Sequence, residues 1–211
     1  MQLLFGTSNQ GKLAVMRRAL KALPDIEIIG LEEIKENLPE IEETGSTPLE
    51  NARLKALAYY DALKIPVFSC DTGLYFDGLP DELQPGVHVR TIQGRRLTDE
   101  EMTAYYAGLA RQYGPLTARF KNAVCFVLDE THIYESMDGS LSGLPFLLVD
   151  TPHPEGYREK GFPLDCLTQN ITTGEYYYDM GENCEDNVAH DKGFYNFFKS
   201  ILEHQTGFPR P

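Results

Sequence analysis

An apolar run that stops at a glycine and leads into a helical pattern constrains this chain most. Leu3–Phe5 is apolar, Gly6 ends the run, and Thr7, Asn9 and Lys12 follow before a helical pattern begins. A buried strand that turns directly into a helix presents backbone N–H groups and the positive end of the helix dipole. Thr7, Asn9 and Lys12 add two hydrogen-bonding side chains and a cation at this corner. The segment therefore predicts a phosphate site, and with it a protein that handles a nucleotide or another phosphorylated small molecule.

The acidic composition narrows the choice of ligand. The 211 residues carry a formal net charge of −13 and no basic run, which argues against a nucleic acid polymer as partner. A nucleotide enzyme is compatible with this charge, because a few local cations can neutralise a triphosphate. The four cysteines show no C-x-x-C pair, and the chain shows no signal-peptide pattern and no membrane-spanning apolar stretch. We expect a reduced, cytoplasmic protein with no membrane partner.

Hydrophobic periodicity and turn residues predict an α/β fold. A long mixed sheet flanked by helices, with two lobes around a central nucleotide cleft, is expected as one domain over residues 1–211. The lobes are expected to be residues 1–114 plus the C-terminal helix, and residues 115–180. Helices are expected over 11–23, 48–63, from a capping box at Thr98 and Glu101, and from about Lys192. Strands are expected over 26–29, 65–70, 118–128, 132–137 and 144–149, with loops over 32–46 and 79–96.

The opening corner almost matches the most common phosphate loop. Gly6, Gly11 and Lys12 satisfy G-x-x-x-x-G-K, but the next residue is Leu13. A P-loop needs serine or threonine there, because that hydroxyl binds the magnesium ion. This segment by itself leaves two readings open: a nucleotide-phosphate grip, or a strand–helix corner at which Lys12 is simply solvated.

A second cluster of charged residues surrounds the start of the helix at 48–63. Glu42 and Glu43 precede it, and Glu50 and Lys55 lie within it. Carboxylates with a lysine near a helix start can hold a divalent ion and a phosphate together. Taken alone, the cluster reads more simply as a solvated acidic loop.

A single carboxylate forms the third cluster. Asp71 is expected at the end of the apolar strand 65–70, beside Gly73. A carboxylate at the carboxyl end of a strand can bind a metal or take a proton from water. An aspartate that closes the strand through an Asx-turn is an equal reading.

The order of these clusters resembles the inosine triphosphate pyrophosphatase family, the non-canonical purine nucleoside triphosphate pyrophosphatases. The family motifs run T-x-N-x-x-K, E-T-G-x-T-x-x-E-N-A-x-x-K-A, D-T/S-G-L and P-G-V. The matching stretches here are 7–12, 43–56, 71–74 and 85–87. The resemblance implies a magnesium-dependent (Mg²⁺) cut between the α- and β-phosphates, and a homodimer.

The resemblance also implies roles for individual residues. Asp71 would activate water, with Lys12 and Lys55 as the other catalytic side chains. Magnesium would be held by Asp71 and by Glu43 or its neighbour Glu42. The triphosphate would be bound by Thr7, Ser8, Asn9, Lys12, Lys55 and Thr72. Positioning and charge neutralisation are the main requirements of phosphoryl transfer, and these residue types supply both.

The base-binding half departs from the family pattern. The family segment G-F-G-Y-D-P corresponds here to residues 161–166, in which Phe162 and Asp165 remain. The last six positions of the family segment K-x-x-x-S-H-R correspond to residues 186–191, in which only His190 remains and Asp191 replaces the arginine. We expect these four residues to contact the base, and an aspartate at 191 would favour donor groups on it.

The predicted function is hydrolysis of a non-canonical or modified nucleoside triphosphate to the monophosphate and pyrophosphate, a house-cleaning activity with altered base preference. Cys70 stands where family members often have a second acid, which leaves the metal site in question. Two alternatives stay open. One is a non-catalytic nucleotide-binding or regulatory protein that kept the fold, and the other is a P-loop-like NTPase that releases orthophosphate.

Overall fold

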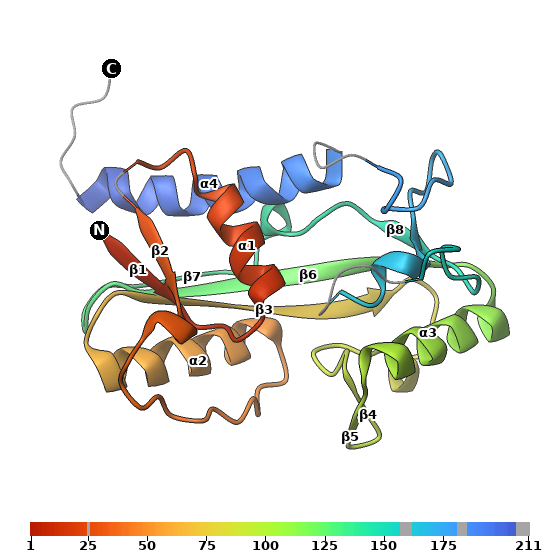
Figure 1. Ribbon diagram of the computed structural model, residues 1–211, viewed down its shortest axis with the longest axis horizontal. Helices are drawn as coiled ribbons and strands as arrows, with labels where there is room; N and C mark the ends of the chain where they lie inside the picture. Colours follow the sequence, from red (N-terminus) through yellow and green to blue (C-terminus); the bar gives the residue numbers. More distant parts are fainter. Residues whose placement is uncertain (25, 157–161, 181–184, 206–211) are drawn as a thin grey trace.

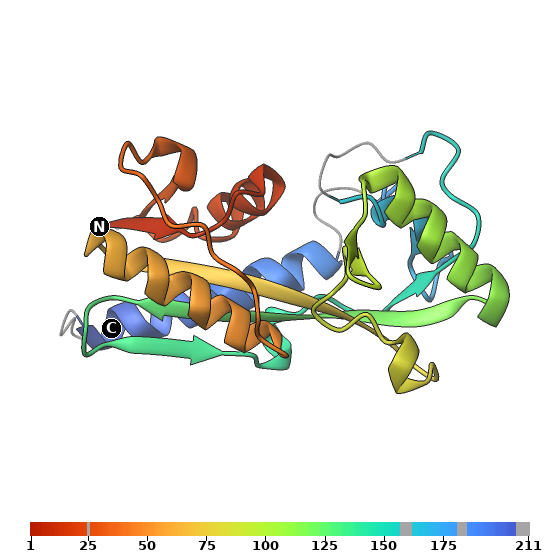
Figure 2. The same cartoon turned by 90° about the horizontal axis from the view of Figure 1, so that it is seen from below.

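One mixed sheet runs through the molecule, with helices on both of its faces (Figure 1, Figure 2). The computed structural model describes residues 1–24, 26–156, 162–180 and 185–205. Within these ranges the strand order is β2-β1-β3-β6-β8-β9, with β7 beside β6. The strands are β1 (Gln2–Phe5), β2 (Glu27–Gly30), β3 (Val67–Phe76), β6 (Leu116–Val127), β7 (Ile133–Ser136), β8 (Phe146–Leu148) and β9 (Thr168–Gln169). This architecture confirms the predicted α/β class with a long mixed sheet.

A long antiparallel ribbon of β3 and β6 connects the two ends of the sheet. The two strands pair continuously from Val67–Val127 to Phe76–Ala118. The other edge of β6 is shared, since β7 pairs with its last residues and β8 with its first. The predicted end of this strand at residue 70 is wrong. Asp71 lies inside β3 because β6 supplies a hydrogen-bonding partner along the whole strand.

Four α-helices cover the sheet: α1 (Gln10–Ala19), α2 (Pro48–Leu63), α3 (Asp99–Tyr113) and α4 (Glu185–Gln205). Short 3-10 helices are η1 (Leu31–Glu33), η2 (Asp81–Leu83), η3 (Gly139–Leu141) and η4 (Asp165–Leu167). The two terminal helices α1 and α4 pack on one face, where Phe5 stacks on Phe68 and Phe198 meets Phe68 edge to face. Helix α2 packs on the opposite face, over Leu4 and Val67. The N-terminal part of the sheet is therefore the middle of three layers.

Local caps explain why two helices begin where they were predicted. The Thr47 hydroxyl accepts a hydrogen bond from Glu50 N at the start of α2, and Pro48 occupies the first turn. Thr98 and Glu101 form the predicted capping box of α3. The predictions for these two helix starts are confirmed.

Three other boundaries differ from the prediction. Helix α1 ends at Ala19 rather than at residue 23, because Leu20 leaves the helical conformation. Helix α4 begins at Glu185, seven residues before the predicted start at Lys192. The predicted loop over 79–96 contains a hairpin of β4 (Thr91–Ile92) and β5 (Arg95–Arg96).

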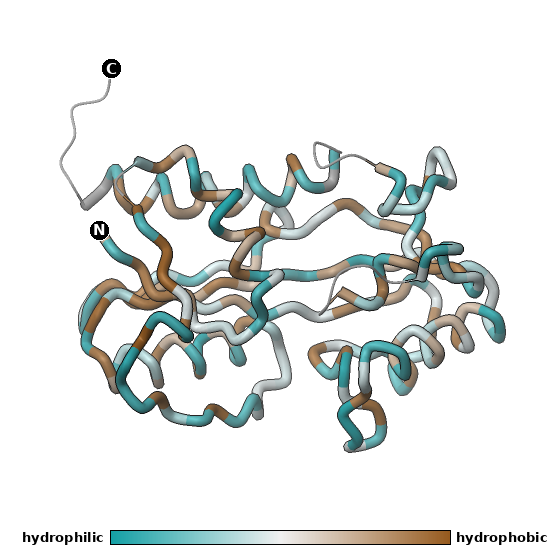
Figure 3. Tube along the Cα trace, viewed as in Figure 1, coloured by the Kyte–Doolittle hydropathy of each residue, from teal (hydrophilic) through white to brown (hydrophobic). Residues whose placement is uncertain are grey.

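The far end of the β3–β6 ribbon has its own core. Leu74 and Phe76 of β3 pack there with Tyr106 of α3 and Phe146 of β8. Helix α3 thus belongs to this second core cluster. In Figure 3 the N-terminal strands are mainly hydrophobic, whereas the helices alternate between hydrophobic and hydrophilic residues, as elements with one buried face do.

No helix in the described part of the chain combines the length and the apolar composition needed to cross a bilayer.

Candidate active site between the two ends of the β3–β6 ribbon

The corner between β1 and α1 is built by its own side chains. Gly6 N donates to Phe68 O at 2.8 Å, and a Cβ at position 6 would overlap Ser69 and Tyr59, so only glycine fits. Asn9 is the N-cap of α1, since its Oδ1 accepts from Lys12 N at 3.2 Å. The Thr7 hydroxyl accepts from Asn9 N at 3.2 Å. The predicted phosphate corner is therefore a capped helix N-terminus, with Ser8 exposed on it.

Lys12 points from this corner to the middle of β3. Its Nζ donates to Thr72 Oγ1 at 3.3 Å, and the Thr72 hydroxyl donates to Asn122 Oδ1 at 2.8 Å. Burial and the nearby charge of Lys55 lower the pKa of Lys12. The lysine is thus held close to a second cation, an arrangement that an incoming phosphate would stabilise.

Two carboxylates share the second lysine. Lys55 Nζ donates to Glu43 Oε1 at 2.7 Å and to Asp71 Oδ1 at 3.1 Å. Burial by itself would lower the pKa of Lys55, but Asp71 and Glu43 outweigh it and the pKa is raised. Burial by itself would raise the pKa of Glu43, but Lys55 outweighs it and that pKa is lowered. At neutral pH the group is an ammonium between carboxylates.

The alternation of side chains along β3 separates these two groups and still keeps them adjacent. Asp71 faces α2 and Lys55, whereas Thr72 faces α1 and Lys12, because successive residues of a strand point to opposite faces. Strand β1 pairs with β3 only as far as Phe5–Phe68. Both lysines and Asp71 therefore lie where β3 continues beyond its shorter neighbour.

Asn51 is a site residue that residue type alone did not reveal. Asn51 is buried, with only 2% of the residue exposed to solvent. Its Oδ1 accepts from Gly45 N at 2.8 Å, and its Nδ2 donates to Asp71 Oδ2 at 3.2 Å. Asn51 thus ties the loop that carries Glu43 to the central carboxylate. The only signal in the sequence is its place inside the long matched motif.

Asn122 is a second residue that only the tertiary structure reveals. It lies opposite Thr72 in the β3–β6 register. Besides accepting from Thr72, its Nδ2 donates to Leu141 O at 3.0 Å and its backbone N donates to Ser142 Oγ at 3.1 Å. Asn122 therefore orients the Thr72 hydroxyl, which accepts a hydrogen bond from Lys12.

The acidic groups fit a magnesium ion that is shared with a substrate. In the described ranges no three His, Cys, Asp or Glu side chains gather in a metal-binding group. Asp71 and Glu43 both form an ion pair with the Lys55 ammonium. Mg²⁺ is commonly bound by one or two carboxylates together with substrate phosphates. Asp71 and Glu43 would hold it here. Glu42 is exposed, and Glu50 accepts from Ser46 N and Oγ instead.

Cys70 does not replace an acid in chemical function. It is 6% exposed and packs in the α1–α4 core cluster. Burial raises the pKa of its thiol to about 12, so the group is neutral at physiological pH and supplies no negative charge.

The residues expected at the base form two pairs on different segments: Asp165 N donates to Phe162 O at 3.3 Å, and His190 and Asp191 are neighbours on α4. Phe162 covers the start of α1, since a Cβ on Gly11 would meet its ring. Asp165 begins η4 in the second core cluster, next to the buried Cys166. Gly161, the first residue of the matched segment, lies outside the described residues. Phe162 is thus the base-side residue that reaches the phosphate corner.

Asp191 contacts an arginine of α1. Arg18 Nε and a terminal guanidinium nitrogen donate to its two carboxylate oxygens at 2.7 and 3.1 Å. Burial would raise the pKa of Asp191, but His190 and Arg18 outweigh it and the pKa is lowered. The ring of His190 lies 4.8 Å from that of Phe194. In this structure Asp191 therefore links α1 to α4.

Comparison with known proteins places this geometry in a family. The model of the Ham1 family matches residues 3–176. A dITP/XTP pyrophosphatase of Deinococcus deserti is 34% identical over 166 residues, covering 79% of this chain and 72% of the relative. The chain belongs to the Ham1 family. A dITP/XTP pyrophosphatase of Borrelia duttonii is 29% identical over 206 residues, covering 95% and 96% of the two chains.

Solved Ham1 structures share the fold. The Staphylococcus aureus Ham1 protein has a TM-score of 0.73 at 23% identity and covers 98% of this chain and 100% of its own. A Ham1 protein from Coxiella burnetii has a TM-score of 0.72 at 22% identity, covering 97% and 99%. The resemblance to the inosine triphosphate pyrophosphatase family is confirmed.

The Ham1 assignment also explains the near-match to a P-loop. Leu13, which follows the G-x-x-x-x-G-K pattern, is 4% exposed and packs in the core beneath α1. At this position Leu13 packs an apolar side chain into the core, whereas a P-loop has a serine or threonine whose hydroxyl binds magnesium. In this Ham1 chain the pattern is a strand–helix corner with a lysine directed at β3.

Proposed function

We propose that this Ham1 chain hydrolyses a nucleoside triphosphate between its α- and β-phosphates, releasing the monophosphate and pyrophosphate with magnesium as cofactor. One observation carries the proposal: Lys55 joins Asp71 and Glu43, with Lys12 close enough to affect the charge of the group. Two lysines and two carboxylates beside a capped helix N-terminus supply phosphate grip, metal ligands and a base in one place.

Each part of the reaction has a residue suited to it. The N-terminus of α1 with Thr7, Asn9 and Lys12 would bind phosphate oxygens, and Lys55 would move from carboxylate to phosphate. Asp71 would accept a proton from the attacking water. The water oxygen bonds to one phosphorus of the α–β bridge, and the bridging oxygen leaves with the other phosphoryl group. Bound magnesium would neutralise charge that develops on the phosphates.

The relatives guide the choice of base. Because they are named dITP/XTP pyrophosphatases, we infer non-canonical purine triphosphates as the substrate class. We further propose that base preference differs from theirs, since Asp191 binds Arg18 where the family pattern has an arginine. A carboxylate there favours hydrogen-bond donors on the base, and Phe162 would stack on it.

A substrate panel tests the reaction. Purified protein is offered dITP, XTP, ITP and the common triphosphates with Mg²⁺, while pyrophosphate and orthophosphate are measured separately. We expect pyrophosphate with at least one deaminated purine. Orthophosphate as the first product would instead indicate γ-phosphate cleavage, and no product from any triphosphate at saturation would overturn the enzymatic proposal.

A matched pair of variants separates catalysis from binding. Asp71→Asn should lower kcat by about a hundredfold or more, since it removes the proposed base. Asp77→Asn is the control, because the carboxylate of Asp77, just after β3, pairs with the exposed Arg119 at 2.9 Å and with no other cation in the described part of the chain. Triphosphate binding with no product in the native protein would support a non-catalytic role.

We also propose a homodimer that works in the cytoplasm. Family resemblance supports the dimer. The free thiols of Cys70, Cys125 and Cys166 are typical of a reducing compartment.

A further inference from the structure

The face of β3 that carries Asp71 also carries a tyrosine that leans toward it. Asp71, Gly73 and Tyr75 occupy alternate positions of the strand, so they share one face. A Cβ on Gly73 would lie 2.8 Å from a ring carbon of Tyr75 and 3.0 Å from its hydroxyl oxygen. The Tyr75 ring therefore lies over Gly73 and leans back along β3 in the direction of Asp71.

A lysine of β6 lies on the same face. Lys121 is the partner of Gly73 in the β3–β6 register, and cross-strand partners point to the same side of a sheet. Cys125 and Val127, at alternate positions farther along β6, pack in the core cluster beneath α2. Lys121 therefore projects on the α2 side of the ribbon, the side on which Lys55 meets Asp71.

Lys121 has two diagonal neighbours on this face, Tyr75 and Asp71. Its Nζ lies 4.4 Å from the centroid of the Tyr75 ring, which is a cation–π contact. Asp71 pairs with Ala123, two residues along β6, and is thus the diagonal neighbour on the other side. Diagonal neighbours in an antiparallel pair are about 7–8 Å apart, which long side chains can span. The Tyr75 ring therefore holds the Lys121 ammonium next to the Asp71 group.

Helix α2 leaves this part of the face uncovered. Asn51 and Lys55, near the start of α2, contact Asp71, so Tyr75 and Lys121 lie beyond the start of the helix. Figure 2 shows the β3–β6 ribbon continuing past that point. Lys121 is accordingly exposed to solvent.

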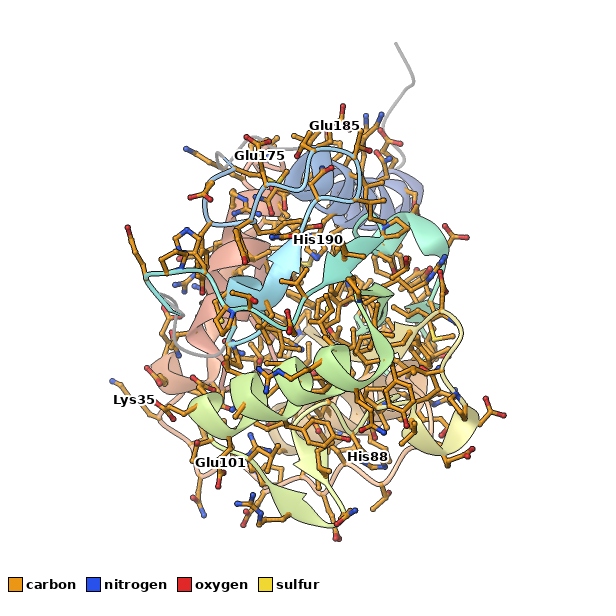
Figure 4. The ribbon with its side chains drawn as sticks, turned by 90° about the vertical axis from the view of Figure 1, so that its right-hand side faces the viewer. Lys35, His88, Glu101, Glu175, Glu185 and His190 are labelled. Atoms are coloured by element: carbon orange, nitrogen blue, oxygen red, sulfur yellow. The ribbon has the colours of Figure 1, made fainter. Side chains whose placement is uncertain are left out.

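The neighbouring edge of β3 is open at Asp71. Strand β1 pairs with β3 no farther than Phe68, and the next backbone partner on that edge in the described part of the chain is Gly86, with bonds of 2.9 and 3.1 Å. His88, just after Gly86, lies in Figure 4 on the side of the molecule opposite Glu185 of α4. A ligand can therefore approach Asp71 along this edge without displacing a strand.

The charge of Lys121 is not matched within the site. Lys12 and Lys55 are balanced by Asp71 and Glu43, so these four side chains have no net charge at neutral pH. Lys121 forms no ion pair with a carboxylate in the described ranges. A hydrogen bond between an ammonium and a phosphate is stronger than an exposed cation–π contact. The Lys121 ammonium can therefore move from the ring to a phosphate.

We propose that Lys121 is a substrate-binding residue that contacts the phosphate chain of the nucleotide from the α2 side, with the Tyr75 ring as its support. This inference rests on the proposed triphosphate substrate. Lys121 supplies the positive charge that the balanced group of two lysines and two carboxylates lacks. A triphosphate that has bound one magnesium ion is still negative, and this charge would attract it.

Three variants test the assignment. Lys121→Met removes the charge and keeps the length of the side chain, and Lys121→Arg restores the charge. Arg119→Met is the matched control, because Arg119 lies two residues away on the same face and is held by Asp77 at 2.9 Å. Affinity is measured by calorimetry with Mg²⁺ and a dITP analogue whose α–β bridge is a methylene group. Thermal melting checks that each variant is folded.

The expected loss is confined to one position. Lys121→Met should weaken analogue binding about tenfold, Lys121→Arg should recover most of the affinity, and Arg119→Met should stay within about twofold of the wild type. In turnover, Lys121→Met should raise KM with little change in kcat, because the contact is already made in the bound substrate.

A pair of variants at Tyr75 tests the support. Tyr75→Phe keeps the ring and should lose less affinity for the analogue than Tyr75→Leu, which should lose about threefold or more because the ammonium is no longer held. Equal affinities in the two variants would overturn the role of the ring.

Each other outcome overturns one proposal in particular. Unchanged analogue affinity in Lys121→Met, an equal loss in Arg119→Met, or a loss that Lys121→Arg does not reverse overturns the role of Lys121, while turnover by the wild type keeps the proposed reaction. Analogue binding that depends on Lys121 in a wild-type protein without turnover overturns the reaction and keeps the binding role. Neither binding nor turnover in the wild type overturns both.

Discussion

Lys12 illustrates at the residue scale how a binding group is held at a cost to stability. Burial and the charge of Lys55 lower its pKa from the ordinary lysine value of 10.5, so the folded state binds this proton less tightly than the unfolded state does. The charged form of Lys12 therefore opposes folding. Stability linked to this group is gained as pH rises through the lowered folded value toward 10.5 and is lost below it.

Lys12→Met should therefore melt at a higher temperature than the wild type at pH 7 and release no pyrophosphate. The difference in melting temperature should shrink as pH rises toward 10.5, because the folded wild-type protein loses this proton below that value. Differential scanning fluorimetry across pH checks this. A variant that melts lower than the wild type at pH 7 would contradict the prediction.

Asn51 is the clearest positioning residue of the site. Asn51→Leu keeps the volume but removes the bonds to Gly45 N and Asp71 Oδ2. We expect kcat to fall about tenfold to a hundredfold and the Mg²⁺ concentration for half-maximal rate to rise, because the Glu43 loop and Asp71 lose their link.

The control for Asn51 is its neighbour. Glu50→Gln affects exposed contacts to Ser46 and to the Thr47 backbone and should leave both quantities within about twofold. Direct Mn²⁺ binding, followed by electron paramagnetic resonance with the methylene analogue present, should weaken in Asn51→Leu. Unaltered metal binding and kcat in that variant would remove Asn51 from the site.

At the element scale, α4 contacts the sheet side through a glycine. A Cβ on Gly193 would overlap the carbonyl of Ser140 in η3, whereas a Cβ on Gly108 in α3 would meet open space. This close approach positions η3, in which the carbonyl of Leu141 accepts a hydrogen bond from Asn122 Nδ2. The packing of one helix thus reaches the Thr72–Lys12 pair through a short chain of hydrogen bonds.

Substitution of alanine for Gly193 and for Gly108 should change the free energy of unfolding in opposite directions. Gly193→Ala should lower the free energy of unfolding by about 1–3 kcal/mol, because backbone must shift. Gly108→Ala should raise it by about 0.5–1 kcal/mol through helix propensity. Denaturant unfolding monitored by circular dichroism measures both. A stabilising effect at Gly193 would mean that α4 and η3 are farther apart than described.

At the scale of the whole molecule, β7 gives the sheet an exposed side. It pairs only with β6 in the described structure, and Ile133 at its start and Met137 just after it are exposed apolar side chains. An open strand edge with apolar residues is a surface on which a second copy can pair.

Sedimentation should therefore give about twice the 23.8 kDa mass of one chain. Ile133→Glu should shift the population toward the monomer if β7 is the contact, and Ile171→Glu, at an exposed apolar residue elsewhere, is the control. A monomeric wild type would contradict the proposed dimer.

The sequence by itself determined the parts that depend on neighbours in the chain. The capped corner at Asn9, the starts of α2 and α3, and the motifs that indicate the Ham1 family all rest on groups a few residues apart. Hydrogen bonds between groups only a few residues apart do not depend on contacts with distant segments of the chain. They can therefore be predicted from residue order.

Only the tertiary structure decided how far β3 extends and what surrounds its middle. The length of β3 depends on pairing with β6, and the register of that pair brings Asn122 to Thr72. The contact of Asn51 with Asp71 and the pairing of Asp191 with Arg18 depend on packing between distant elements. Such contacts form between groups that chain order does not place together, so residue type alone could not reveal them.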